Sequence, residues 1–120
     1  MLSGVASYEL ELRDTEHDDV VLVELSGELD LTAAAELERR LEEAASHGSV
    51  LVLDLNSVSF LDSAALHVLF RVARRLAQRE MRFGIVLDPT ALVARTVSIV
   101  GLDEVTLVRP TLEEIVGAPS

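Results

Sequence analysis

Segments with the periodicity of strands alternate along this chain with segments that have the periodicity of helices. The most constraining segment is Val50 to Leu55, an apolar run that only Asp54 interrupts. Such a run is typical of a strand that is covered on both faces, as in a parallel sheet. Strands that alternate with helices favour parallel pairing through crossover connections, so the pattern predicts an α/β fold.

The remaining elements follow from hydrophobic periodicity and from helix start and stop signals. Further strands are predicted over residues 8–13, 20–25, 82–87 and 105–108. Helices are predicted over residues 32–45, 62–79, 88–100 and 111–116, with Asp88-Pro89 starting the third and Gly101 ending it. The polar stretch 14–19 is expected to connect a hairpin. We therefore expect one domain over residues 1–120, with its core at about 8–117: a mixed, mostly parallel sheet with an N-terminal antiparallel hairpin strand and about four helices.

The chain is strongly acidic, with 10 Lys+Arg against 21 Asp+Glu and a net charge of −11 over 120 residues. Nucleic acids and anionic membrane surfaces attract clustered cations, so neither is an expected partner. No apolar run approaches the roughly 20 residues of a membrane span, and Met1 to Ala6 lacks the pattern of a signal peptide. The chain has no cysteine, which excludes a disulfide framework and a thiolate site and favours a cytoplasmic protein.

Motifs for metal, nucleotide or hydrolytic chemistry are missing from the sequence. His17, His47 and His67 each stand alone, without a second ligand at metal-binding spacing. Neither the G-x-G-x-x-G nor the G-x-x-x-x-G-K-[ST] phosphate loop occurs, and there is no G-x-S-x-G elbow. No catalytic residue, metal site or cofactor is therefore expected.

A polar pair, Asp62-Ser63, stands where the second long helix is predicted to begin. Either residue can cap the helix by accepting a backbone N–H hydrogen bond. The position also suits a phosphate, because a helix N-terminus offers free N–H groups and a positive dipole end. A phosphoserine would add about −1.5 to −2 charges, repel a partner that carries carboxylates, and crowd Asp62 and Asp30. The residues alone leave both roles open.

Two longer segments carry a recognisable pattern. Gly27-Glu28-Leu29-Asp30 reads G-E-L-D after the second predicted strand, and residues 52–66 lead from a strand into Phe60-Leu61-Asp62-Ser63-Ala64-Ala65-Leu66. The first resembles the G-E-L-D turn of the STAS domain family, and the second resembles its F-[LM]-D-S-[ST]-G-L loop and helix start. With the Gly101-Leu102 pair and the order of elements, the chain resembles the bacterial anti-sigma factor antagonists of that family.

The resemblance implies a partner-switching function. In this family the unmodified antagonist binds an anti-sigma factor that is also a serine kinase, which frees the sigma factor to recruit RNA polymerase. The kinase uses ATP to phosphorylate the serine that follows the aspartate of the motif, here Ser63, and binding ends. A PP2C-type phosphatase restores the unmodified form. The free antagonist is expected to be a monomer or a weak dimer.

The partner-binding surface that the resemblance implies has six members: Glu28, Asp30, Asp62, Ser63, Ala64 and Ala65. Ala64 and Ala65 depart from the family pattern, which often has a second hydroxyl residue and then glycine. Ser63 is thus the sole residue of this loop that can receive the phosphate. An alanine in place of glycine favours the helix by about 1 kcal/mol, provided that the position does not require a positive φ.

Simpler interpretations stand beside these assignments. Asp30 is equally a cap for the helix that begins at Leu31 or Thr32, and Glu28 a solvated side chain. The arginines at 71, 74, 75 and 79 are expected to line an exposed helix face and pair with Glu80 and its neighbours, with a patch for an acidic partner as the alternative.

Two other functions remain open from the sequence. The first is an accessory STAS subunit of an ABC-type lipid transporter, which copurification with an ATPase would indicate. The second is an enzyme or nucleotide hydrolase that uses the acidic loops. It lacks a phosphate-binding loop and would need nucleotide turnover that Asp30→Ala or Ser63→Ala abolishes.

Overall fold

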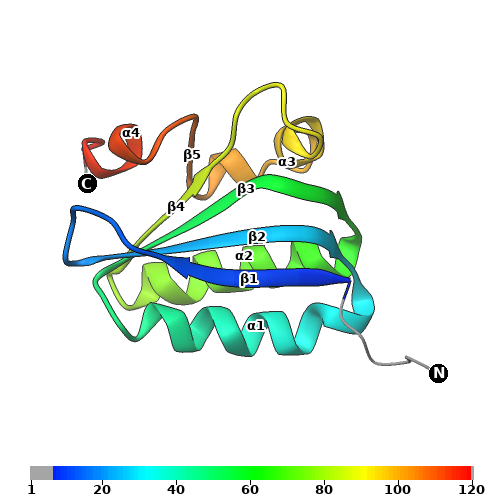
Figure 1. The fold of residues 1–120 in the computed structure, drawn as a ribbon, viewed down its shortest axis with the longest axis horizontal. Coiled ribbons are helices and arrows are strands. Elements are labelled where there is room, and N and C mark those ends of the chain that lie inside the picture. Colours follow the sequence, from blue (N-terminus) through cyan, green and yellow to red (C-terminus); the bar gives the residue numbers. More distant parts are fainter. Residues whose placement is uncertain (1–6, 120) are drawn as a thin grey trace.

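A computed structural model describes residues 7–119 of the chain as an α/β domain (Figure 1). The prediction that Met1 to Ala6 is not a signal peptide concerns residues outside this range. The strands are β1 (Tyr8–Arg13), β2 (Val20–Leu29), β3 (Val50–Leu61), β4 (Arg82–Val86) and β5 (Leu107–Arg109). The helices are α1 (Leu31–Ala45), α2 (Ser63–Gln78), α3 (Ala94–Ile99) and α4 (Leu112–Val116), with a 3₁₀ turn η1 at Leu102–Glu104.

The five strands form one sheet in the order β1-β2-β3-β4-β5. β1 runs antiparallel to β2, and every other neighbouring pair is parallel. This confirms the predicted mixed, mostly parallel sheet with an antiparallel N-terminal strand and four helices. No helix in the described part of the chain is long and apolar enough to cross a membrane.

The main hydrophobic core lies between the sheet and the pair α1 and α2. Leu37 of α1 and Leu69 of α2 are fully buried there, together with Leu53 of β3. A second, smaller core lies where Ile115 of α4 packs with Val52 of β3. Because Val52 and Leu53 are consecutive and belong to different cores, β3 is covered on both faces, as its apolar run predicted.

β2 and β3 are longer than the sequence pattern predicted. β2 continues through Gly27, Glu28 and Leu29 of the G-E-L-D segment, and β3 continues to Leu61, so the first three residues of this segment are strand and not a turn. Two register shifts between β2 and β3 absorb the irregular sequence. At one of them Gly27 has φ of +88°, and a Cβ there would lie 2.2 Å from the Ser7 carbonyl oxygen. Glycine is therefore required for the shape of the strand.

The third helix begins later than predicted. Asp88 accepts hydrogen bonds from the backbone N–H of Thr90 at 2.8 Å and from its hydroxyl at 2.7 Å, which closes a turn before α3 begins at Ala94. The side-chain and backbone bonds from Thr90 hold the pKa of Asp88 below its usual range. An aspartate followed by proline thus makes a turn here and does not start a helix.

The last strand also lies later than predicted, at Leu107–Arg109 and not at 105–108. The backbone N–H groups of Val105 and Thr106 both donate to the Leu102 carbonyl, at 3.2 Å each. These bonds extend the turn of η1 through the two residues that precede β5.

Candidate functional site

The carboxyl end of the sheet brings two helix N-termini together. β2 and β3 pair in parallel as far as Leu29 and Leu61. α1 begins two residues after Leu29, and α2 begins two residues after Leu61. The single residues between strand and helix are Asp30 and Asp62, so they lie side by side at one end of the molecule (Figure 1). We call this end, with Glu28 and residues 60–65, the carboxyl-end surface.

Asp30 caps α1. Its Oδ1 accepts hydrogen bonds from the backbone N–H of Thr32 at 3.0 Å and from the Thr32 hydroxyl at 2.6 Å. A side-chain oxygen in this position satisfies one of the free N–H groups of the first helical turn. The capping interpretation of Asp30 is therefore confirmed. Partner binding by the same residue stays a prediction.

Asp62 connects the two helices. Its Oδ1 accepts from the backbone N–H of Ala65, which caps α2 at 3.0 Å. Its Oδ2 accepts from the backbone N–H of Leu31, the first residue of α1, at 2.9 Å. Of the two caps that the sequence allowed, Asp62 is the one present. One carboxylate thus fixes the relative position of two helix N-termini that are distant in sequence.

Ser63 is the first residue of α2, and its side chain is exposed. Its hydroxyl makes no hydrogen bond within the described residues, so it is free to accept a modifying group. The next residue, Ala64, is half-buried, and Ala65 is fully buried. Both are helical, and in residues 7–119 the only non-glycine with a positive φ is Glu80. Alanine at these two positions therefore carries no backbone strain.

Glu28 lies beside this group on β2, where it pairs in register with Phe60 of β3. Its side chain is exposed. The fold thus brings all six expected residues to one end of the molecule, but Ala65 is buried beneath the surface and offers no side chain to a partner. Two further members were missed from the sequence: Leu31 and Phe60 are 73% and 48% exposed. The register shift next to Phe60 ends the regular alternation of β3, so periodicity gave no signal of this exposure.

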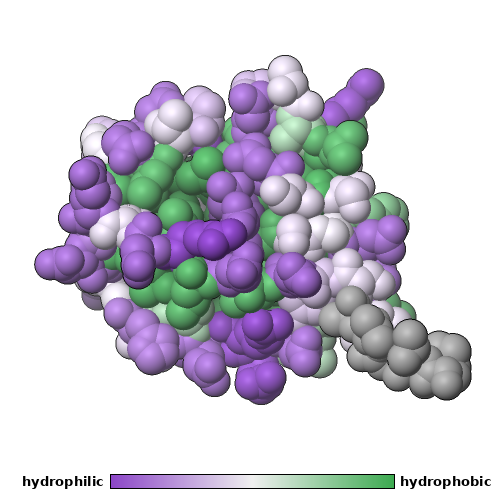
Figure 2. All heavy atoms as spheres, in the orientation of Figure 1, coloured by the Kyte–Doolittle hydropathy of each residue, from purple (hydrophilic) through white to green (hydrophobic). Residues whose placement is uncertain are grey.

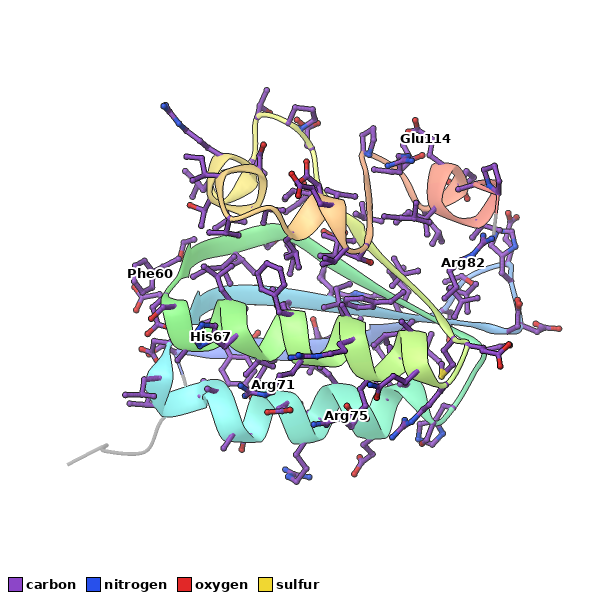
Figure 3. The ribbon with its side chains drawn as sticks, turned by 180° about the vertical axis from the view of Figure 1, so that it is seen from behind. Phe60, His67, Arg71, Arg75, Arg82 and Glu114 are labelled. Carbon is purple, nitrogen blue, oxygen red and sulfur yellow. The ribbon has the colours of Figure 1, made fainter. Side chains whose placement is uncertain are left out.

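The arginines of α2 do not pair with Glu80. Glu38 and Glu42 of α1 pair with Arg71 and Arg75 of α2 and with Arg79, which caps the end of that helix (Figure 3). The ion pairs are Arg71–Glu38 at 2.8 Å, Arg75–Glu38 at 3.4 Å, Arg75–Glu42 at 2.8 Å and Arg79–Glu42 at 3.3 Å. We call these five residues the α1–α2 ladder.

The ladder lowers the pKa of one of its carboxylates, that of Glu38. The hydrogen bonds from the Arg71 guanidinium hold the pKa of Glu38 below its usual range, although partial burial opposes this shift. Glu38 therefore stays charged to a lower pH than an unpaired glutamate, and it offsets part of the positive charge of Arg71 and Arg75. Within the described residues, no group of three or more His, Asp or Glu side chains is arranged to hold a metal ion.

The sequence of this domain matches a known family. The STAS domain family matches residues 11–115, and the chain belongs to it. A curated relative, the anti-sigma-F factor antagonist RsfB of Mycobacterium tuberculosis, is 32% identical over 100 residues, which are 82% of this chain and 80% of the relative.

Two solved structures extend the comparison. An anti-sigma factor antagonist from Mycobacterium paratuberculosis superimposes with a TM-score of 0.77 and 33% identity, over 92% of each chain. The unphosphorylated form of the anti-sigma factor antagonist SpoIIAA has a TM-score of 0.68 over 90% of this chain and 93% of its own. At 19% identity this second likeness concerns the fold alone.

Proposed function

We propose that this protein is an anti-sigma factor antagonist that acts by partner switching, with Ser63 as the phosphorylated residue. The observation that carries the proposal is the exposed, unbonded Ser63 hydroxyl at the start of α2. In the proposed cycle the unmodified protein binds an anti-sigma factor that is also a serine kinase. Phosphorylation ends binding, and a PP2C-type phosphatase reverses it.

The relatives support this assignment. RsfB and the Mycobacterium paratuberculosis protein, each more than 30% identical to this chain, are both named as anti-sigma factor antagonists. SpoIIAA, which shares the fold, has been solved in an unphosphorylated and in a phosphorylated form. Phosphorylation of a protein with this fold is therefore compatible with a folded structure.

The surroundings of Ser63 explain how a phosphate would end binding. Asp62 precedes Ser63 and already accepts the Ala65 N–H, which leaves fewer donors for a phosphate. Arg71, two turns further along α2, is bound to Glu38. A phosphate of about −1.5 to −2 charges would therefore lie beside the Asp62 carboxylate, with Arg71 already bound to Glu38. A bound partner would have to bury that charge, which costs several kcal/mol per unpaired ion.

The proposal is tested with full-length chains used as baits in a lysate of the source organism. Ser63→Ala is expected to capture an anti-sigma factor, whereas Ser63→Asp is expected to capture at least tenfold less. With the purified partner, Mg²⁺ and ATP should release the wild-type protein and leave Ser63→Ala bound. Mass spectrometry should then locate the phosphate on Ser63.

Ser57→Ala is the matched control, because Ser57 is an exposed hydroxyl of β3 outside the helix start. It should bind and be released as the wild type is. Release of Ser63→Ala by ATP, or a phosphate on another residue, would contradict the proposed switch. Capture of a membrane-associated ATPase in place of an anti-sigma factor would contradict the proposed partner.

A further inference from the structure

Two large apolar side chains are exposed at the carboxyl-end surface. Without a partner to cover them, they gain no hydrophobic stabilisation there. Leu31 is 73% exposed and Phe60 is 48% exposed. The other leucines of the adjoining strand ends, Leu29 and Leu61, are buried. Apolar side chains that are exposed next to a binding surface regain about 25 cal/mol for each Å² that a partner covers.

The backbone of both residues is held in place by the fold. The backbone N–H of Leu31 donates to Asp62 Oδ2 at 2.9 Å, so α1 begins at a fixed place relative to α2. Phe60 belongs to β3 and pairs in register with Glu28, and Figure 3 shows it at the end of the molecule where α2 begins. A backbone that is positioned before binding loses less conformational entropy on association than a mobile one.

The two aspartates of this surface already have intramolecular partners. Each oxygen of Asp62 accepts a backbone N–H bond, from Ala65 and from Leu31. Asp30 Oδ1 accepts two bonds from Thr32. The two aspartates therefore act first on the local backbone, and a partner gains less from pairing with them than their exposure suggests.

We propose that Leu31 and Phe60 are the apolar anchors by which the carboxyl-end surface binds its anti-sigma factor. The inference rests on the proposed function, and it adds which side chains supply the binding affinity of that site. The partner is expected to offer an apolar pocket to each side chain, since central apolar and aromatic residues commonly carry most of the energy of an interface. A second copy of this chain is disfavoured as the occupant, because Glu28, Asp30 and Asp62 of two copies would face one another in proteins of net charge −11.

The anchors also explain why Ser63 is an effective switch. Ser63 follows Phe60 by three residues and follows directly the aspartate that holds Leu31. A partner that covers both anchors excludes water from the region around Ser63. Electrostatic interactions strengthen as the local dielectric constant falls, so a phosphate there becomes more costly to bury beside Asp62.

The test measures binding of the purified anti-sigma factor to Leu31→Ser, Phe60→Ser and the double variant by isothermal titration calorimetry. Each single variant is expected to weaken binding at least tenfold, and the double variant at least a hundredfold. Leu12→Ser is the matched control, because Leu12 is 58% exposed on β1, near the hairpin at the opposite end of the sheet (Figure 1). It should bind as the wild type does, and thermal melts should establish that all variants are folded.

The outcomes separate the two proposals. Suppose that the wild type binds and Ser63→Asp does not, but Leu31→Ser and Phe60→Ser bind normally. The proposal that Leu31 and Phe60 are anchors is then wrong, and the proposed phosphorylation switch at Ser63 is kept. An equal loss in Leu12→Ser would also overturn the anchors. If the wild type is a dimer that Leu31→Ser and Phe60→Ser convert to monomers in sedimentation experiments, the surface serves self-association and the inference fails. If the wild type binds no anti-sigma factor, the proposed function itself fails.

Discussion

The α1–α2 ladder and the carboxyl-end surface are both exposed and both rich in carboxylates, but they use these groups differently. In the ladder, Glu38 and Glu42 are neutralised by arginines of the neighbouring helix. At the carboxyl end, Asp30 and Asp62 bind backbone N–H groups, and a free hydroxyl and two apolar side chains remain exposed. Charge therefore does not mark the candidate binding surface of this protein. The surface is marked by the exposed Ser63 hydroxyl and by the exposed apolar side chains of Leu31 and Phe60.

Figure 2 illustrates the same point for a third region, the face of the sheet opposite α1 and α2. Hydrophilic side chains surround separate apolar areas on that face. On the β1–β2 hairpin Arg13 pairs with Glu24 at 2.6 Å and with Glu11 at 3.0 Å. These partners are exposed and lie on one hairpin, so the pairs contribute little stability.

The largest effect is expected from Asp62→Ala, because it removes the acceptor of two helix N-termini at once. We expect the free energy of unfolding to fall by about 2 kcal/mol, at the upper end of the range for a single cap. Urea denaturation measures this change. Asp30→Ala, which frees only the N-terminus of α1, should cost about half as much. Equal losses in the two variants would show that the bond from Leu31 to Asp62 adds nothing.

A smaller effect is expected from the ladder. Glu42→Gln removes the charge that binds Arg75 and Arg79, and it should lower the free energy of unfolding by about 0.5 kcal/mol, as for other partly exposed pairs. Glu43→Gln is the control, since Glu43 reaches only Arg39 at 3.9 Å and is 70% exposed. Binding of the anti-sigma factor should be unchanged in both. A loss of binding in Glu42→Gln would extend the interface to the ladder and remove the contrast between the two regions.

The smallest effect concerns pH. The Arg71 guanidinium holds the pKa of Glu38 lower in the folded protein than in the unfolded chain. The stability from this pair is therefore present above the usual glutamate pKa and is lost as the pH falls through the lowered value. Wild type should lose slightly more stability than Glu38→Gln over that acidic range, measured by urea denaturation at several pH values. Parallel curves for the two proteins would contradict the assignment.

The sequence by itself determined the features that depend on neighbouring residues. The apolar run from Val50 to Leu55 predicted a strand covered on both faces, and the alternation of elements predicted the mixed sheet. Capping was one of the two interpretations that the sequence allowed for Asp30, because capping involves residues two or three positions apart. The position of Ser63 at a helix start followed in the same way. Such patterns are local, so they are legible without the fold.

Only the tertiary structure decided the features that depend on distant residues. The bond from Leu31 to Asp62 spans 31 positions, and the one from Arg71 to Glu38 spans 33. The length of β2 and β3 depends on the register shifts through which Gly27 and its neighbours pair. The exposure of Leu31 and Phe60 depends on what the finished fold leaves uncovered. Helix packing and strand pairing determine these contacts, because they set which backbone and charged groups come within hydrogen-bonding distance of one another.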